Sequence, residues 1–193
     1  HLYLAIEGRL AAVICVEDPL REEAADAVRE LKEAGITKVV MMTGDSERTA
    51  AAIAKRVGGD EYYSEVLPED KASFVEKEKK LGHKVIMIGD GINDSLALSS
   101  ASVGIAISDG AAIAREIADV TISADNLHEI VTLKRLSTAL MKRIHNNYRT
   151  IIGVNGGLIA LGVTGVIMPT TSALLHNLST LTISLRSMRN LLP

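Results

Sequence analysis

Segments that favour strands and segments that favour helices alternate through most of this 193-residue chain. Short runs of strand-forming residues predict strands at residues 37–42, 61–63, 85–88, 103–107 and 120–123. Apolar residues at helical spacing predict helices at residues 21–34, 47–57, 68–81, 95–100 and 111–118. Such alternation is typical of βαβ units. We therefore expect an α/β fold with a parallel sheet and helices on both faces.

The segments on either side of this pattern differ from it. Residues 2–6 and 10–16 flank the turn-like sequence Glu7-Gly8-Arg9 and predict two further strands. From residue 126 onward no strand pattern appears, and leucines and isoleucines recur at helical spacing as far as Leu140. A helix is therefore expected directly after the sheet.

The stretch from Thr150 to Leu185 contains no Asp, Glu, Lys or Arg. A membrane helix needs about 20 predominantly apolar residues, and Pro169 divides this longer stretch in two. Basic residues stand at both outer ends, and the glycines inside the stretch suit close helix packing in lipid. The sequence predicts two transmembrane helices below a cytoplasmic α/β domain. A buried helical hairpin in a soluble core is the alternative.

Composition narrows the possible functions. The chain has 21 Lys and Arg against 24 Asp and Glu, and a net charge of −3 argues against binding of nucleic acid. A single cysteine excludes an internal disulfide. The chain opens on His1-Leu2-Tyr3, with no starting Met and no basic leader, so we expect a fragment of a longer protein.

An acidic loop follows the apolar run at residues 85–88. The sequence Gly89-Asp90-Gly91-Ile92-Asn93-Asp94 begins where that strand is expected to end, and ligands of open α/β sheets bind at this edge. Asp90 and Asp94 are four residues apart and supply the oxygen ligands that Mg²⁺ prefers. The pattern indicates a Mg²⁺ site. The alternative is an acidic turn in which Asp94 or Ser95 caps a helix.

Two more segments carry groups suited to a phosphoryl group. Thr43 follows a predicted strand and offers a hydroxyl and a backbone amide, and Gly44 permits close approach of a phosphate. Lys71 offers a compact positive charge. A helix-capping loop at residues 43–45 and a solvated lysine are the alternatives. Together with the paired aspartates, these residues predict phosphoryl chemistry.

Four sequence motifs resemble those of a known family. Thr43-Gly44-Asp45, Pro68-Glu69-Asp70-Lys71 and the loop from Gly89 to Asp94 resemble the later motifs of the haloacid-dehalogenase-like fold as they occur in P-type ATPases. Asp18-Pro19-Leu20-Arg21 resembles that family's hinge between the nucleotide and phosphorylation domains. With two membrane spans close behind the sheet, the chain resembles the heavy-metal-transporting (type IB) branch.

The resemblance implies a haloacid-dehalogenase-like (Rossmannoid) parallel sheet with flanking helices, followed by two transmembrane α-helices. It implies part of an ATP-driven pump that works through an aspartyl-phosphate. Mg²⁺ would be the cofactor and ATP the substrate of the full-length protein. The partners would be a heavy-metal cation, the lipid bilayer of a multi-pass protein in a bacterial cell membrane, and the missing amino-terminal part of the pump.

The resemblance also assigns roles to residues. Thr43 would hold the phosphate, with Gly44 beside it, and Lys71 would stabilise the phosphorylated state. Asp90 would ligate Mg²⁺, and Asn93 and Asp94 would position the ion and the phosphate. Asp18 and Arg21 would lie at the domain hinge, on the nucleotide side. Asp45, counted with Thr43, Gly44, Lys71 and Asn93 among the catalytic residues, would link the hinge to nucleotide binding.

Candidates for the transported metal lie in the second predicted span. His176 and Thr180 are four residues apart and share a helix face, and Ser179 lies between them. An ionisable residue inside a span is a functional candidate, so His176 leads this group, with Asn155 of the preceding span second. The alternative is a structural histidine hydrogen-bonded to a neighbouring helix.

The resemblance divides the chain into four parts. They are the end of the nucleotide-binding domain with its return strand (1–16), the later part of the phosphorylation domain (17–125), a linking helix (126–149) and two transmembrane helices with a turn near Pro169 (150–193). The family's phosphorylated Asp-Lys-Thr-Gly-Thr sequence is absent, so we expect the isolated chain to be inactive. A soluble haloacid-dehalogenase-like phosphatase with a helical cap and a membrane-anchored Mg²⁺-binding regulatory domain remain as alternatives.

Overall fold

The core strands of the computed structural model are parallel, as the alternating pattern predicts. The structure describes residues 2–14, 20–89, 93–107, 116–122 and 126–191. Strands β5 (Ile86–Gly89), β6 (Val103–Ile107) and β7 (Val120–Ile122) form one sheet in that order, and β3 (Val40–Met42) and β4 (Glu61–Tyr63) form a second. The expected parallel pairing is confirmed. Within these ranges, however, no hydrogen-bonded ladder joins the two groups into one sheet.

Strand β3 is shorter than the predicted 37–42 because Asp60 holds the backbone in front of it. The carboxylate of Asp60 accepts a hydrogen bond from the Val39 amide at 2.7 Å, and the Asp60 amide donates to the Val39 carbonyl at 2.8 Å. Lys32 also donates to the Asp60 carboxylate, at 2.8 Å. These contacts take the place of ladder pairing.

In the described part of the chain four helices precede or connect these strands. They are α1 (Ala24–Glu33), α2 (Glu47–Val57), α3 (Pro68–Lys80) and α4 (Ser95–Ser100). Local signals explain their ends: Pro68 occupies the first turn of α3, where its missing amide costs nothing, and Gly58 ends α2 with a left-handed φ of 76°. The helix expected at residues 111–118 lies mostly outside the described residues.

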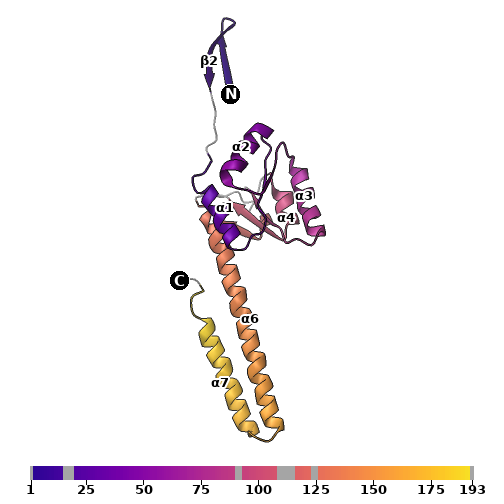
Figure 1. Ribbon diagram of the computed structural model, residues 1–193, viewed down its shortest axis with the longest axis vertical. Helices are drawn as coiled ribbons and strands as arrows, with labels where there is room; N and C mark the ends of the chain where they lie inside the picture. Colours follow the sequence, from indigo (N-terminus) through magenta and orange to yellow (C-terminus); the bar gives the residue numbers. More distant parts are fainter. Residues whose placement is uncertain (1, 15–19, 90–92, 108–115, 123–125, 192–193) are drawn as a thin grey trace. The chain divides into compact units, whose positions relative to one another are not determined.

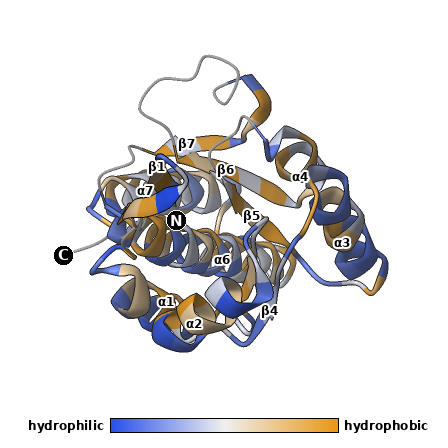
Figure 2. Cartoon of the chain, turned by 90° about the horizontal axis from the view of Figure 1, so that it is seen from above, coloured by the Kyte–Doolittle hydropathy of each residue, from blue (hydrophilic) through white to orange (hydrophobic). Residues whose placement is uncertain are grey.

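Small side chains let α3 and α4 pack closely on the β5–β7 sheet. Buried Ala72 and Val75 of α3 meet Ala97 of α4, next to Val85 and Met87. In Figure 2, β5 and β6 are largely orange and white and α3 is largely blue, which places the apolar surface inside. A Cβ on Gly104 of β6 would lie only 2.6 Å from the Leu98 carbonyl oxygen, so the glycine permits the close approach of α4.

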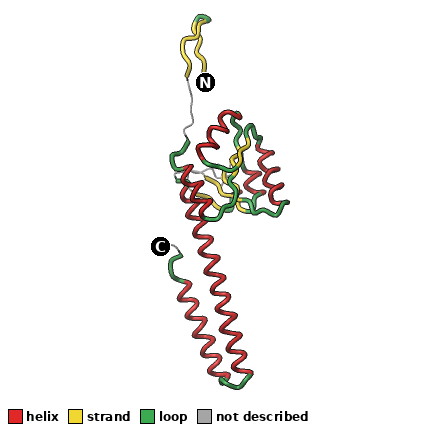
Figure 3. The backbone as a smooth tube through the Cα atoms, in the orientation of Figure 1, coloured by secondary structure: helices red, strands yellow, loops and turns green. Residues whose placement is uncertain are grey.

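The first two strands form a separate antiparallel hairpin, β1 (Leu2–Ile6) and β2 (Arg9–Ile14) (Figure 3). Glu7 and Gly8 have φ values of 51° and 75°, the positive pair that a tight hairpin turn of type I′ requires. Large apolar side chains of both strands are exposed, among them Tyr3, Ile6 and Leu10.

The chain divides into two compact units, residues 1–129 and 130–193. The second holds most of α6 (His128–Val163) and all of α7 (Pro169–Ser187), which run antiparallel, side by side (Figure 1). The predicted linking helix and first span are therefore one continuous helix of 36 residues. Pro169 opens α7 instead of forming the turn, which lies at residues 164–168 and contains Gly165 with a φ of 74°.

Neither α6 nor α7, nor any other helix in the described part of the chain, combines the length and apolar character of a membrane span. The two transmembrane helices expected from the sequence are not shown by the structure.

Candidate phosphoryl-transfer site

A part-buried ion pair joins two of the predicted site residues. Lys71 Nζ, in the first turn of α3, donates to Oδ1 of Asp94 at 2.7 Å. The two side chains are only 15% and 12% exposed, so little water screens their charges. Lys71 is therefore not a solvated helix residue. Asp94 stands at the N-cap position of α4 but makes no side-chain capping bond, and its Oδ1 accepts from Lys71 instead.

Gly89, the last residue of β5, makes room for this pair. A Cβ on Gly89 would lie 2.8 Å from the Asp94 Cβ and 2.9 Å from its Cγ, distances that real side chains do not adopt. The glycine is required because the Asp94 side chain lies against the end of the strand. Sequence analysis named Gly89 only as part of a loop, and its steric role could not be read from the spacing.

Thr43 and Asp45 form a second hydrogen-bonded pair in the loop after β3. Thr43 Oγ1 donates to Oδ2 of Asp45 at 2.8 Å and accepts from the Asp45 amide at 3.1 Å. The backbone of Thr43 is held by the Tyr63 carbonyl and the Val66 amide, each at 3.0 Å. The loop is therefore tied to the end of β4 and not to the cap of α2, where Ser46 makes no side-chain capping bond.

The site residues thus fall into two pairs. Among the described residues no hydrogen bond or ion pair links Thr43 and Asp45 to Lys71 and Asp94. Packing within the protein does not require a glycine at residue 44. A Cβ on Gly44 would lie 3.8 Å from the Val66 carbonyl oxygen, an ordinary van der Waals distance. Asn93 is exposed.

The hinge candidates are only partly covered by the structure. Arg21 lies 3.8 Å from the Glu23 carboxylate, and its side chain is about half exposed. Asp18 and Asp90 lie outside the described residues, so their predicted roles stay predictions.

The chemistry of Asp94 fits the Mg²⁺ that the family implies. Among the bonds of the described residues only its Oδ1 is engaged, by Lys71, which leaves Oδ2 as an anionic oxygen ligand. No group of three potential metal ligands occurs in the described part of the chain. Asp90 is the residue that the sequence nominates as a further ligand.

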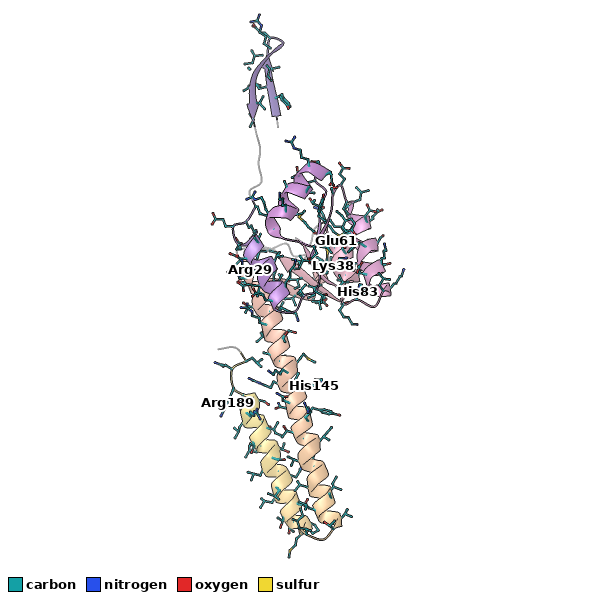
Figure 4. The ribbon with its side chains drawn as sticks, viewed as in Figure 1. Arg29, Lys38, Glu61, His83, His145 and Arg189 are labelled. Carbon is teal, nitrogen blue, oxygen red and sulfur yellow. The ribbon has the colours of Figure 1, made fainter. Side chains whose placement is uncertain are left out.

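A polar cluster that sequence analysis missed ties β4 to α2. Glu47 accepts hydrogen bonds from the hydroxyls of Ser64 and Tyr62, and these two bonds lower the pKa of its carboxyl. The bond to Glu47 raises the pKa of the Tyr62 hydroxyl. Lys38 and Glu61, labelled in Figure 4, pair at 2.9 Å, which raises the pKa of Lys38 and lowers that of Glu61. The partners in each pair are 15 to 23 residues apart in the sequence, and no periodicity in the sequence predicts such contacts.

The metal candidates of the helical unit meet across the two helices. His176 Nδ1 of α7 lies 2.8 Å from Oδ1 of Asn155 on α6, so the structure brings these two together. Ser179 and Thr180 instead donate their hydroxyls to the His176 carbonyl, at 2.8 Å and 3.1 Å. A bond to a neighbouring helix is what a structural histidine makes. It also orients the ring in the way that metal-binding histidines are oriented.

Residues 2–102 match the haloacid dehalogenase-like hydrolases, and the chain belongs to this family. It is also 45% identical over 174 residues to the copper-transporting ATPase 2 of Rhizobium meliloti, and 38% identical over 189 residues to the zinc-exporting P-type ATPase of Mycobacterium marinum. These alignments cover 90% and 97% of the chain but only 21% and 26% of the relatives. The chain therefore spans about a quarter of the length of these relatives or less.

Solved structures agree with the sequence matches. The crystal structure of a zinc-transporting PIB-type ATPase in its E2.Pi state superposes with a TM-score of 0.86 at 32% identity, covering 97% of this chain and 30% of that one. The resemblance to heavy-metal P-type ATPases drawn from the sequence motifs is confirmed by these matches.

Proposed function

We propose that this chain is part of an ATP-driven heavy-metal cation pump that works through an aspartyl-phosphate and Mg²⁺. The observation that carries the proposal is the extent of the similarity. The hydrolase family accounts for residues 2–102, whereas the metal-transporting ATPases match 90% to 97% of the chain, including the helical unit. A soluble phosphatase of the same family gives no reason for that second match.

The two hydrogen-bonded pairs suit distinct tasks in this function. Lys71, held by Asp94, brings a positive charge to the transferring phosphoryl group, and Thr43 offers a hydroxyl and an amide to its oxygens. Asp90 and Asp94 would hold Mg²⁺, which neutralises charge on the same oxygens, and Asn93 would help to position it. Asp18 and Arg21 would lie at the hinge, on the nucleotide-binding side, where ATP is the substrate. Asp45 would link this hinge to nucleotide binding.

The acceptor of the phosphoryl group must come from elsewhere. The 193 residues contain no Asp-Lys-Thr-Gly-Thr sequence. In the described residues β3 pairs only with β4, and β5 only with β6, so each has an edge without a strand partner. An inserted parallel strand that ends in the phosphorylated Asp would satisfy these backbone groups and bring that Asp to the loops of Thr43 and Asp94.

Part of the helical unit belongs in the membrane under this proposal, with the α/β domain in the cytoplasm. Support comes from the absence of charge between Thr150 and Leu185 and from exposed large apolar side chains on both helices, such as Ile159 of α6 and Leu178 of α7. Glycines, hydroxyls and the pair Asn155–His176 lower the average hydropathy of this stretch. Polar groups facing one another between helices are what a transport path requires.

His176 is suited to bind the transported cation through its second nitrogen. If Nδ1–H donates to the Asn155 carbonyl oxygen, Nε2 carries the lone pair that a metal needs. Thr180 and Ser179, one turn further along α7, would supply weaker oxygen ligands.

Lys71→Ala in the complete pump tests the proposal. We expect metal-stimulated ATP hydrolysis to fall by roughly 100-fold, the usual effect of removing one charge-stabilising group. Lys80→Ala, which removes an exposed lysine at the end of the same helix, should leave the rate unchanged. Equal rates for all three proteins would reject the role of Lys71.

The isolated chain provides the second half of the test. It should form no phosphoenzyme with radiolabelled ATP, and an acid-stable labelled band would refute the need for another segment. It should bind orthovanadate in the presence of Mg²⁺ and bind it more weakly after Lys71→Ala. Equal binding by both proteins would favour a regulatory domain that retains Mg²⁺ affinity only.

A further inference from the structure

The helical unit carries positive charge without any negative charge to balance it. Residues 130–193 contain no Asp and no Glu. Their basic residues are Lys134, Arg135, Lys142, Arg143, Arg149, Arg186 and Arg189. Any anion that neutralises these side chains must therefore come from outside this unit.

Four of these cations line one hollow between α6 and the end of α7. The hollow has a volume of about 420 Å³, and Lys142, Arg143, Arg186 and Arg189 line it together with side chains such as Asn146. Arg189 lies just beyond the end of α7 (Figure 4). With no carboxylate in its lining, the hollow is suited to an anion.

Arg143 builds the hollow and is not free for a ligand. Its guanidinium donates to the carbonyls of Ser187 at 3.0 Å and Asn190 at 2.7 Å, and also to that of Arg189. Asn147 Nδ2 donates to the Ser187 hydroxyl at 2.7 Å. These bonds satisfy the last carbonyl of α7 and two carbonyls just beyond it, and they hold residues 187–190 against α6.

The other three cations have no partner among the residues that the structure describes. In the described part of the chain the side chains of Lys142, Arg186 and Arg189 make no hydrogen bond or ion pair. Three unpaired cations within one preformed hollow repel one another, and a bound anion removes this repulsion.

We infer that this hollow binds the phosphate group of an anionic phospholipid. Phosphate accepts hydrogen bonds on all its oxygens and pairs with arginine in a forked geometry, and a hollow of about 420 Å³ has room for a glycerol moiety too. Arg186 stands directly outside the uncharged stretch from Thr150 to Leu185, and Lys142 precedes that stretch by eight residues. Both lie on the side of the lipid headgroups if the stretch lies in the membrane. The lipid source rests on the membrane placement proposed above, whereas binding of the phosphate group does not.

Native mass spectrometry of the detergent-solubilised chain tests this inference with dioleoylphosphatidylglycerol, dioleoylphosphatidylcholine and glycerol 3-phosphate as probes. The wild type should bind dioleoylphosphatidylglycerol more tightly than dioleoylphosphatidylcholine. In R186Q/R189Q that binding should weaken on the order of tenfold or more. The control K134Q/R149Q removes equal charge outside the hollow and should bind like the wild type. Lys142→Gln, which cannot disturb the end of α7, repeats the test singly.

Each outcome decides the matter. Equal binding of phosphatidylglycerol by the wild type and R186Q/R189Q, or equal losses in both double variants, would overturn the inference. Glycerol 3-phosphate binding as tightly as the lipid would assign the hollow to a soluble phosphate compound. The lipid-binding measurement uses neither ATP nor a transported metal. Its result therefore remains valid even if the proposed pump function is rejected.

Discussion

The Asp94 carboxylate lies directly against Gly89, in the space where a side chain at residue 89 would begin. This contact fixes the direction of the carboxylate at the end of β5, and the 2.7 Å bond from Lys71 holds its other side. A glycine, a lysine and an aspartate from three separate elements thus determine one another's positions.

Gly89→Ala should disrupt this arrangement. The new methyl group would displace Asp94, and we expect a loss of about 1–3 kcal/mol in the free energy of unfolding, the usual cost of overpacking. Thermal unfolding followed by circular dichroism measures the loss of stability. We also expect weaker Mg²⁺-dependent binding of orthovanadate by this variant. The control is Gly59→Ala, whose Cβ would lie 3.6 Å from the nearest oxygen. Unchanged stability and binding in Gly89→Ala would show that Asp94 is free to move.

Acidification should remove a contribution of Asp60 to stability. The hydrogen bond from Lys32 and then the one from the Val39 amide lower the pKa of the Asp60 carboxyl. The unfolded chain therefore binds this proton more readily than the folded one. The contribution is complete above the unperturbed pKa of about 3.9 and is lost as the pH falls through the lower pKa of the folded protein.

Melting temperatures between about pH 2 and pH 6 test this sign. Asp60→Asn should be less stable than the wild type at pH 6, and the difference should shrink as the pH falls. Lys32→Met should show part of the same effect because it removes the first of the two donors. Parallel curves for wild type and Asp60→Asn would contradict the prediction.

His176→Ala in the complete pump should abolish metal-stimulated ATP hydrolysis and leave phosphorylation by inorganic phosphate largely intact. The reason is that His176 would act on the cation and not on the phosphoryl group. Asn155→Ala should weaken metal affinity by roughly 10–100-fold, because it only orients the ring. His145→Ala, at an exposed position of α6, is the control. Metal stimulation that survives His176→Ala would make His176 structural.

Arg143→Lys should loosen the end of α7. A lysine lacks the planar fork that reaches the carbonyls of Ser187, Arg189 and Asn190, so roughly a tenfold loss of amide protection is expected around residues 186–190. Hydrogen exchange followed by mass spectrometry measures it, with Arg149→Lys as the control. Identical exchange in the wild type and Arg143→Lys would mean that these bonds contribute nothing to the helix end.

Sequence reasoning reached the local features of the fold with good accuracy. The bounds of α2, α4, β4 and β6 and the start of α3 agree with the predicted segments. The reason is that apolar periodicity, Pro68 and Gly58 act on the backbone within a few residues. It failed where a boundary depends on distant contacts. Asp60 shortens β3, and nothing interrupts α6 at the junction expected near residue 150.

The amino-acid sequence was enough to predict the alternation of strands and helices, the charge-free stretch and the residue types that a phosphoryl site needs. Those properties depend on residue spacing and composition, which can be read from neighbouring residues along the chain. Three features became visible in the folded chain alone: Lys71 meets Asp94, Gly89 must lack a side chain, and His176 meets Asn155. Contacts over 21 and 23 residues depend on how helices and strands pack, and packing distances of a few ångströms are not encoded in any periodicity.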